Sequence, residues 1–233
     1  MEYLSFKDFK GYEIITSYRK GGVSEGNYDS LNLSFDVKDK KENVYENRNR
    51  FFKAINLNQE NIVEINPKNC PVLPIKCSND KDVAIAITHS DSLSLFFVVE
   101  NKKIFGALQV TTKMLLEGVL EKSIRAFMKE QNVKSNDIKI YFAPSLAFTN
   151  NEICKIKANK LIKNGYADVV KRINNLYYFD EQELAIKRLR KVGILMKNMA
   201  FASLNTYEDS DLLFSKKRKT PTGKMMSVIR VIK

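Results

Sequence analysis

The sequence predicts an α+β fold in a single domain over residues 1–233. Strand-like apolar runs occur in groups between helical segments, without the regular strand–helix alternation of a parallel α/β protein. No internal repeat, low-complexity tract or linker rich in Pro, Gly and Ser divides the chain. With 44% hydrophobic and 28% charged residues, 233 residues are enough to bury a core without disulfide bonds.

The first half of the chain contains one clear helix and three clear strands. Val44, Phe51 and Ile55 are seven and four residues apart, which places them on one face of an amphipathic helix over residues 43–55. Runs of apolar residues predict three strands, at 83–88, 93–99 and 104–110. The polar residues 101–103 predict the tight turn between the last two.

The second half is predicted to be mainly helical. Leu115, Leu120 and Phe127 belong to a helical pattern over residues 115–127. Gly165 and Gly193 stand where a glycine commonly follows the last turn of a helix. The remaining predicted elements are a strand at 138–142, helices at 152–163 and 181–192, and a final strand at 225–232.

Composition excludes several classes of protein. The net charge is +12, from 39 Lys and Arg against 27 Asp and Glu, but the basic residues are spread along the chain. The densest run, 216–219, predicts a solvated surface, so a nucleic-acid partner is not expected. No apolar stretch is long enough to cross a membrane, the N-terminal residues do not resemble a secretion signal, and the three cysteines show no pairing pattern. We therefore expect a cytoplasmic protein.

Candidate chemistry centres on the segment 19–33 and the helix that follows it. Gly21 and Gly22 allow backbone N–H groups to converge, Ser24 adds a hydroxyl, and Arg19 and Arg48 could supply positive charge to an anion such as phosphate. The alternative is an ordinary glycine turn beside a surface arginine.

A metal site rich in histidine is not available to this chain. His89 is its only histidine, and no CxxC pair occurs. A site built from His89 with Cys70 or Cys77 is one possibility, and a buried structural histidine is the favoured alternative.

Segment 19–33, together with Asn47 and Arg48, resembles the laccase-domain family, called polyphenol oxidases in older naming. Residues 143–153, 205–207, 214–218 and 222–224 resemble further motifs of that family, so the resemblance runs nearly end to end. It implies a layered α/β sandwich with mixed sheets and outer helices. It also implies purine nucleoside phosphorolysis, adenosine deaminase side activity and a zinc cofactor, assigned as copper in the older naming.

The sequence departs from this family at the metal ligands. The resemblance places Asn66, Ser92 and Gln109 where the family has His, Cys and His, with Lys68 in place of Asn66 if the register slips. Amide and hydroxyl groups bind Zn²⁺ weakly, so no metal cofactor is expected. Asp91 occupies the position of the family's Asp and is the candidate catalytic residue, as a hydrogen-bond donor or acid toward the leaving purine.

Three functions remain open at this point. The first is a weakened, metal-independent phosphorylase with purine nucleoside and phosphate as substrates. The second is a non-catalytic relative that binds a nucleoside or a protein, and the third is a nucleic-acid binder that uses the positive charge.

Overall fold

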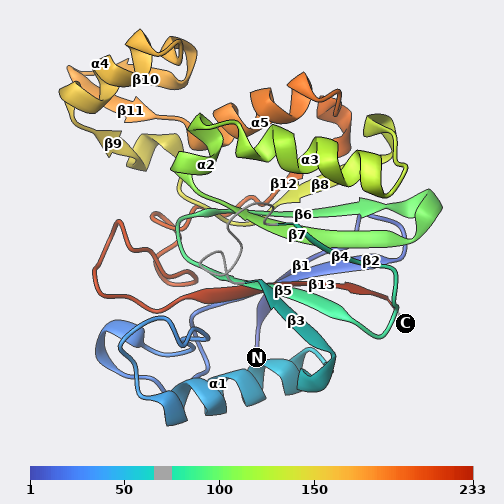
Figure 1. Cartoon of the computed structure of the whole chain (residues 1–233). Helices are drawn as coiled ribbons and strands as arrows, with labels where there is room; N and C mark the ends of the chain where they lie inside the picture. The colour runs from blue at the N-terminus through green and yellow to red at the C-terminus, as the bar shows by residue number, and fades with distance from the viewer. Residues whose placement is uncertain (66–74, 233) are drawn as a thin grey trace.

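Two mixed β-sheets lie face to face at the centre of the structure (Figure 1). The computed structural model describes residues 1–65 and 75–232. The strands of the first sheet, in spatial order, are β1 (Tyr3–Phe6), β2 (Tyr12–Ser17), β13 (Met225–Val231), β5 (Ala84–His89) and β3 (Ile62–Ile65). All neighbours are antiparallel except β3 and β5, which run parallel.

The second sheet is also mixed. Its strands, in spatial order, are β12 (Met199–Phe201), β8 (Lys139–Phe142), β6 (Leu93–Val99), β7 (Ile104–Val110) and β4 (Lys76–Ser78). Only β12 and β8 are parallel. Both sheets therefore fit the mixed-sheet sandwich that the sequence predicts.

Strand β6 is apolar on both faces because it is covered on both sides. Phe96 and Val98 point into the layer between the two sheets, while Leu95 and Phe97 point to the helices outside. Successive side chains of a strand alternate between faces, so a nearly continuous apolar run indicates a strand buried on both sides.

Helices cover the outer faces of both sheets (Figure 1). Helix α1 (Lys41–Ala54) packs Phe51 and Phe52 against the first sheet. The second sheet is covered by α2 (Thr112–Leu116), α3 (Val119–Glu130) and α5 (Glu181–Lys191). None of the helices in the described residues has the length and apolar character needed to span a membrane.

A smaller unit stands at one end of the sandwich (Figure 1). It consists of α4 (Lys155–Lys163) and an antiparallel sheet in the order β10 (Val170–Ile173), β11 (Leu176–Phe179) and β9 (Glu152–Ile153). Its buried residues, among them Leu161 and Phe179, belong to the same apolar cluster as the outer face of the second sheet.

The predicted helix over 115–127 is wrong in one respect, because it is two helices. Gly118 has a φ of 69°, which ends the helical path between α2 and α3. The carbonyl of Leu116 accepts a hydrogen bond from the Tyr166 hydroxyl at 2.7 Å and one from Arg188 at 3.4 Å. These contacts from distant segments satisfy a carbonyl that a continuous helix would have bonded internally.

The predicted helix over 152–163 begins three residues later than expected. Glu152 and Ile153 form β9 by pairing with Tyr178 and Tyr177 of β11, and α4 starts at Lys155. Gly165 and Gly193 have φ values of 85° and 93°, as predicted for glycines that follow a helix.

Candidate functional site

A pocket of about 400 Å³ opens where β3, β5 and β7 end. Arg48 reaches it from α1, and Glu64, Thr88 and Gln109 reach it from the carboxyl ends of those three strands. Ser92, just before β6, completes this wall. The pocket has the size of a small-molecule site, and it lies where the two sheets meet.

Ser92 and Gln109 form a hydrogen-bonded pair in this pocket. The Gln109 Nε2 donates to Ser92 Oγ at 2.8 Å and to the Thr88 carbonyl at 3.4 Å. The Gln109 side chain faces the space between the sheets, as Phe105 and Ala107 do on the same strand. The structure thus brings together two of the three positions that the family resemblance assigns to metal ligands, and joins them directly.

The described residues of this site do not fit a zinc ion. Zn²⁺ takes thiolate, imidazole or carboxylate ligands, whereas Ser92 offers a neutral hydroxyl and the Gln109 amide nitrogen is used as a donor. Within 1–65 and 75–232, no three His, Cys, Asp or Glu side chains form a group that could hold a metal. Asn66 and Lys68, the two candidates for the remaining ligand position, lie outside the described residues.

The charges that line the pocket compensate one another. Arg48 donates through both terminal nitrogens to the Glu64 carboxylate, at 2.8 and 3.0 Å, and through Nε to the Leu33 carbonyl at 2.8 Å. Lys224 Nζ lies 3.7 Å from an oxygen of Asp36. With two cations and two carboxylates, the part of the lining that belongs to the described residues has no net charge.

An aromatic wall completes the pocket. The Phe35 ring is 40% exposed, and the Arg48 guanidinium lies 4.6 Å from its centre. The ring also contacts Tyr45, at 4.8 Å between centroids. Phe35, Glu64 and Lys224 were not predicted as site residues, although Lys224 belongs to the motif at 222–224. Each comes from a different part of the chain, and only the fold brings them to one pocket.

The glycine segment folds around Asn47 and does not line this pocket. Asn47 is fully buried; its Oδ1 accepts from Val23 N–H at 2.8 Å, and its Nδ2 donates to Ser24 Oγ at 2.9 Å. Ser24 Oγ in turn donates to Asp39 at 2.6 Å. The backbone N–H of Gly22 is bonded to Ser30 Oγ at 3.1 Å. These groups are therefore occupied within the protein.

Arg19 and Arg48 are held by separate sets of partners. Arg19 donates to the carbonyls of Asp29 and Ser210, and its guanidinium lies 4.8 Å from the Phe214 ring centre. Of the residues predicted to bind phosphate, only Arg48 lines the pocket, and Arg19, Gly21, Gly22 and Ser24 do not. Their role toward phosphate stays a prediction.

Asp91 joins three segments of the chain. One carboxylate oxygen accepts from Thr206 Oγ1 at 2.7 Å, and the other accepts from the Lys217 backbone N–H at 2.8 Å. Asp91 is not among the pocket-lining residues. Its two hydrogen bonds hold the loops of Thr206 and Lys217 together. Its catalytic role stays a prediction.

The basic run 216–219 is partly turned inward. Arg218 donates to the carbonyls of Thr206 and Tyr207, both at 2.7 Å, and to that of Leu213 at 2.5 Å. Lys217 Nζ donates to the Glu152 carbonyl at 3.2 Å, so two of the four cations of this run hold loops together.

His89 lies in a buried polar chain and not in the pocket. It is 1% exposed, its Nε2 lies 2.7 Å from Ser227 Oγ, and Ser227 Oγ lies 2.7 Å from Thr16 Oγ1. Cys77 is exposed on β4, and Cys70 lies outside the described residues. The geometry of His89 is that of the structural histidine favoured from the sequence.

His89 should make the protein less stable in mild acid. Burial lowers the pKa of His89 to about 4, from an ordinary 6.5, and the charge of Lys224 acts in the same direction. The unfolded chain therefore binds this proton first as pH falls, so the contribution is complete above pH 6.5 and is lost toward pH 4. Uptake of one proton by the unfolded chain alone lowers the free energy of unfolding by about 1.4 kcal/mol per pH unit. Across this window the loss is on the order of 3 kcal/mol.

The measurement is the free energy of unfolding in urea between pH 7 and pH 4.5, for the parent and for His89→Gln. The variant should show the shallower pH dependence, since the other titrating groups are shared. Equal slopes for the two proteins would contradict the assignment.

Fold and site together define the class of protein. The sequence pattern of the family described as multi-copper polyphenol oxidoreductase laccase matches residues 13–232, and the chain belongs to this laccase-domain family.

Its curated relatives carry a more specific name. The chain is 27% identical over 237 residues to "Purine nucleoside phosphorylase YfiH" of Shigella flexneri, covering 96% of this chain and 95% of that protein. It is 26% identical over 242 residues to the purine nucleoside phosphorylase of Haemophilus influenzae, covering 94% of each.

Solved structures agree on the fold. YlmD from Geobacillus stearothermophilus has a TM-score of 0.84 at 17% identity, covering 97% of this chain and 93% of that chain. YfiH from Bacillus licheniformis has a TM-score of 0.85 at 16% identity, covering 99% and 96%. The layered α/β sandwich that the resemblance implies is confirmed.

Proposed function

We propose that the protein binds a purine nucleoside in the pocket of Phe35, Arg48, Ser92 and Gln109, without a metal ion. We further propose that zinc-dependent phosphorolysis is lost and that any remaining phosphorylase activity is weak. The hydrogen bond between Ser92 and Gln109 carries this proposal, because it occupies two ligand positions with groups that bind a base or a sugar better than a metal.

The pocket's polarity suits a neutral ligand. Because the Gln109 amide nitrogen already donates to Ser92 and Thr88, its carbonyl oxygen is left as an acceptor. Ser92 accepts from Gln109, so its own hydroxyl hydrogen remains to be donated. A purine edge offers matching donors and acceptors, and Phe35 supplies an apolar wall for the ring.

The same charges explain why we expect phosphorolysis to be slow. In this transferase reaction, phosphate attacks the anomeric carbon of the ribose and the base departs. Cations that are free to face the phosphate would stabilise the developing charge. Arg48 is instead held by Glu64, and Lys224 lies beside Asp36. Asp91 remains the candidate for hydrogen bonding to the leaving base.

We also propose a cytoplasmic location. Cys77 and Cys154 are free thiols in the described residues, which suits a reducing compartment.

Nucleoside binding is tested by calorimetry with inosine and adenosine. Gln109→Ala should weaken binding at least about tenfold, the effect of removing roughly 1.4 kcal/mol of interaction. Gln59→Ala is the matched control, because Gln59 is exposed and does not line the pocket. Equal binding by both variants would place the nucleoside elsewhere.

The same preparations test catalysis. Release of hypoxanthine from inosine with phosphate should be slow and should not change with a chelator or with added zinc. Rapid, zinc-dependent turnover by the parent protein would overturn the metal-independent part of the proposal.

A further inference from the structure

An ion pair between Arg48 and Glu64 forms one wall of the pocket of about 400 Å³. The Arg48 side chain is 9% exposed and the Glu64 side chain is 31% exposed, so the carboxylate is the more accessible of the two charges. The two terminal nitrogens of Arg48 donate to different oxygens of Glu64, at 2.8 and 3.0 Å. A carboxylate held in this bidentate way occupies the donors that an arginine would otherwise offer to a phosphate group.

Arg48 is also held by contacts that do not involve Glu64. Its Nε donates to the Leu33 carbonyl at 2.8 Å, and its guanidinium lies 4.6 Å from the centre of the Phe35 ring. Loss of the charge on Glu64 would therefore leave Arg48 in place, with its positive charge at the pocket wall.

Glu64 keeps this lining neutral. The second cation, Lys224, has Asp36 beside it, with 3.7 Å between Nζ and the carboxylate oxygen. The described residues of the lining carry two cations and two carboxylates, so a neutral side chain at position 64 would change their net charge from zero to +1.

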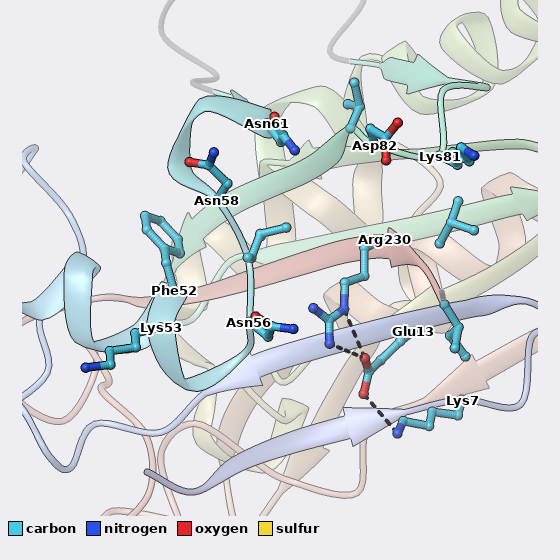
Figure 2. A pocket seen from close by; sticks show the side chains of 14 residues that line it. Lys7, Glu13, Phe52, Lys53, Asn56, Asn58, Asn61, Lys81, Asp82 and Arg230 are labelled. Carbon is cyan, nitrogen blue, oxygen red and sulfur yellow. Dashed lines mark hydrogen bonds and ion pairs between the residues drawn. The ribbon is translucent and has the colours of Figure 1, made fainter.

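The other cavity of the protein with an arginine–glutamate pair is not balanced in this way. Its volume is about 740 Å³, and Figure 2 shows Arg230 and Glu13 in its lining, with 3.0 and 2.8 Å between the arginine nitrogens and one carboxylate oxygen. Its described lining has four cations and two carboxylates, an excess of two positive charges. Charge balance is therefore a particular property of the smaller pocket.

The two carboxylates also differ in what they can offer to a ligand. Glu13 is 5% exposed, and its second oxygen accepts from Ser5 Oγ at 2.7 Å and lies 3.2 Å from Lys7 Nζ (Figure 2). Among the described residues, Glu64 accepts from Arg48 alone. A carboxylate has about four acceptor positions, so Glu64 keeps acceptor capacity toward the pocket.

The remaining acceptor positions of Glu64 suit hydroxyl groups. A ribose donates through its hydroxyls, whereas a phosphate group brings negative charge and accepting oxygens against a carboxylate. Ser92 and Gln109, which we propose as partners of the base, come from the second sheet, while Arg48 and Glu64 come from α1 and β3. The base and the sugar would thus be recognised on different walls.

We propose that Glu64 is a specificity-determining residue of this pocket, an inference that rests on the proposed nucleoside function. Its carboxylate accepts ribose hydroxyl groups and keeps Arg48 from binding phosphate. The pocket thereby selects purine nucleosides against their phosphate esters.

Calorimetry with inosine and inosine 5′-monophosphate tests this assignment, because the two ligands differ only by the phosphate. The parent should bind inosine at least about tenfold more tightly than the monophosphate. Glu64→Gln keeps the size of the side chain and removes its charge. Its affinity for the monophosphate should be at least about tenfold higher than that of the parent, and added salt should reduce the gain. Inorganic phosphate should bind saturably to this variant and not to the parent.

Two further variants are the controls. Glu64→Asp keeps the negative charge and should discriminate between the two ligands as the parent does. Glu46→Gln removes the same charge from an exposed pair on α1, where the Glu46 carboxylate lies 2.6 Å from Arg50 Nε, and it should bind both ligands like the parent.

Equal affinity of the parent for inosine and its monophosphate would overturn the assignment without any variant. So would a Glu64→Gln protein that gains affinity for neither the monophosphate nor inorganic phosphate, or an equal gain in Glu46→Gln. Failure of the parent to bind inosine would overturn the proposed function instead. In that case a gain of phosphate binding by Glu64→Gln would still support the exclusion of anions by Glu64.

Discussion

Asn47→Ala is expected to lower the free energy of unfolding by about 4 kcal/mol, the effect of leaving several buried polar groups without partners. The Asn47 side chain makes four hydrogen bonds while fully buried: with Val23 N–H, Ser24 Oγ, and the carbonyls of Ser30 and Asn32. Alanine can make none of these hydrogen bonds, so the buried groups around position 47 lose their partner.

Asn49→Ala is the matched control, because Asn49 lies on the same helix and is exposed. Its effect should stay within about 0.5 kcal/mol, as for most surface substitutions. Urea unfolding at neutral pH measures both. A difference between the variants of less than about 1 kcal/mol would show that the loop rearranges and finds other partners.

The second large effect is a gain of zinc. The parent, purified without an affinity tag, should contain no stoichiometric zinc or copper, because Ser92 and Gln109 offer no thiolate or imidazole. The triple variant Asn66→His/Ser92→Cys/Gln109→His should contain close to one zinc per chain. The Oγ of Ser92 and the Nε2 of Gln109 are 2.8 Å apart, so side chains at these positions can approach one ion at the usual ~2.0–2.3 Å.

Single substitutions provide the controls for this gain. None of the three alone should bind zinc stoichiometrically, since one strong ligand is not a site. Elemental analysis gives the metal content, and purine release with phosphate gives activity. Zinc without activity would mean that the substrate pocket has changed. A triple variant without zinc would show that the resemblance assigns the ligand positions wrongly, and close to one zinc in the parent would contradict the ligand argument itself.

Strong local patterns predicted much of the fold. The strands at 93–99 and 104–110 match β6 and β7 residue for residue, and the helix at 43–55 matches α1 within two residues. These elements are covered by apolar layers, so the apolar residues in their own sequence are enough to indicate that they are buried.

Strand β2 was not predicted from the sequence, because its polar residues are stabilised by a strand that is distant in the chain. Its sequence places Glu13, Thr16 and Ser17 among apolar residues, which weakens a strand pattern. All three are buried, and each is satisfied by β13 or its neighbours: Glu13 by Arg230, Thr16 by Ser227, and Ser17 by Met226 N–H. A polar residue in a core is stable only with such partners, and those partners are more than 200 residues away.

For the candidate site, too, only part of the arrangement could be predicted from the sequence. The prediction that Ser92 and Gln109 stand where the family has metal ligands comes from the family resemblance and from the identity of these residues, without a structure. The predicted grouping of Arg19, Ser24 and Arg48 as one anion site did not follow, because the structure brings only Arg48 to the pocket.

The sequence by itself therefore determined the family and the mixed-sheet sandwich, and it predicts that Ser92 and Gln109 stand at two ligand positions of the family. Only the tertiary structure decided that the Arg48 charge is neutralised by Glu64 and that Asn47 organises the glycine segment. Residue identity sets which interactions a side chain can make, because that is a property of its chemistry. Which partner satisfies it depends on chain segments far apart in sequence, and these meet only when the two sheets pack together.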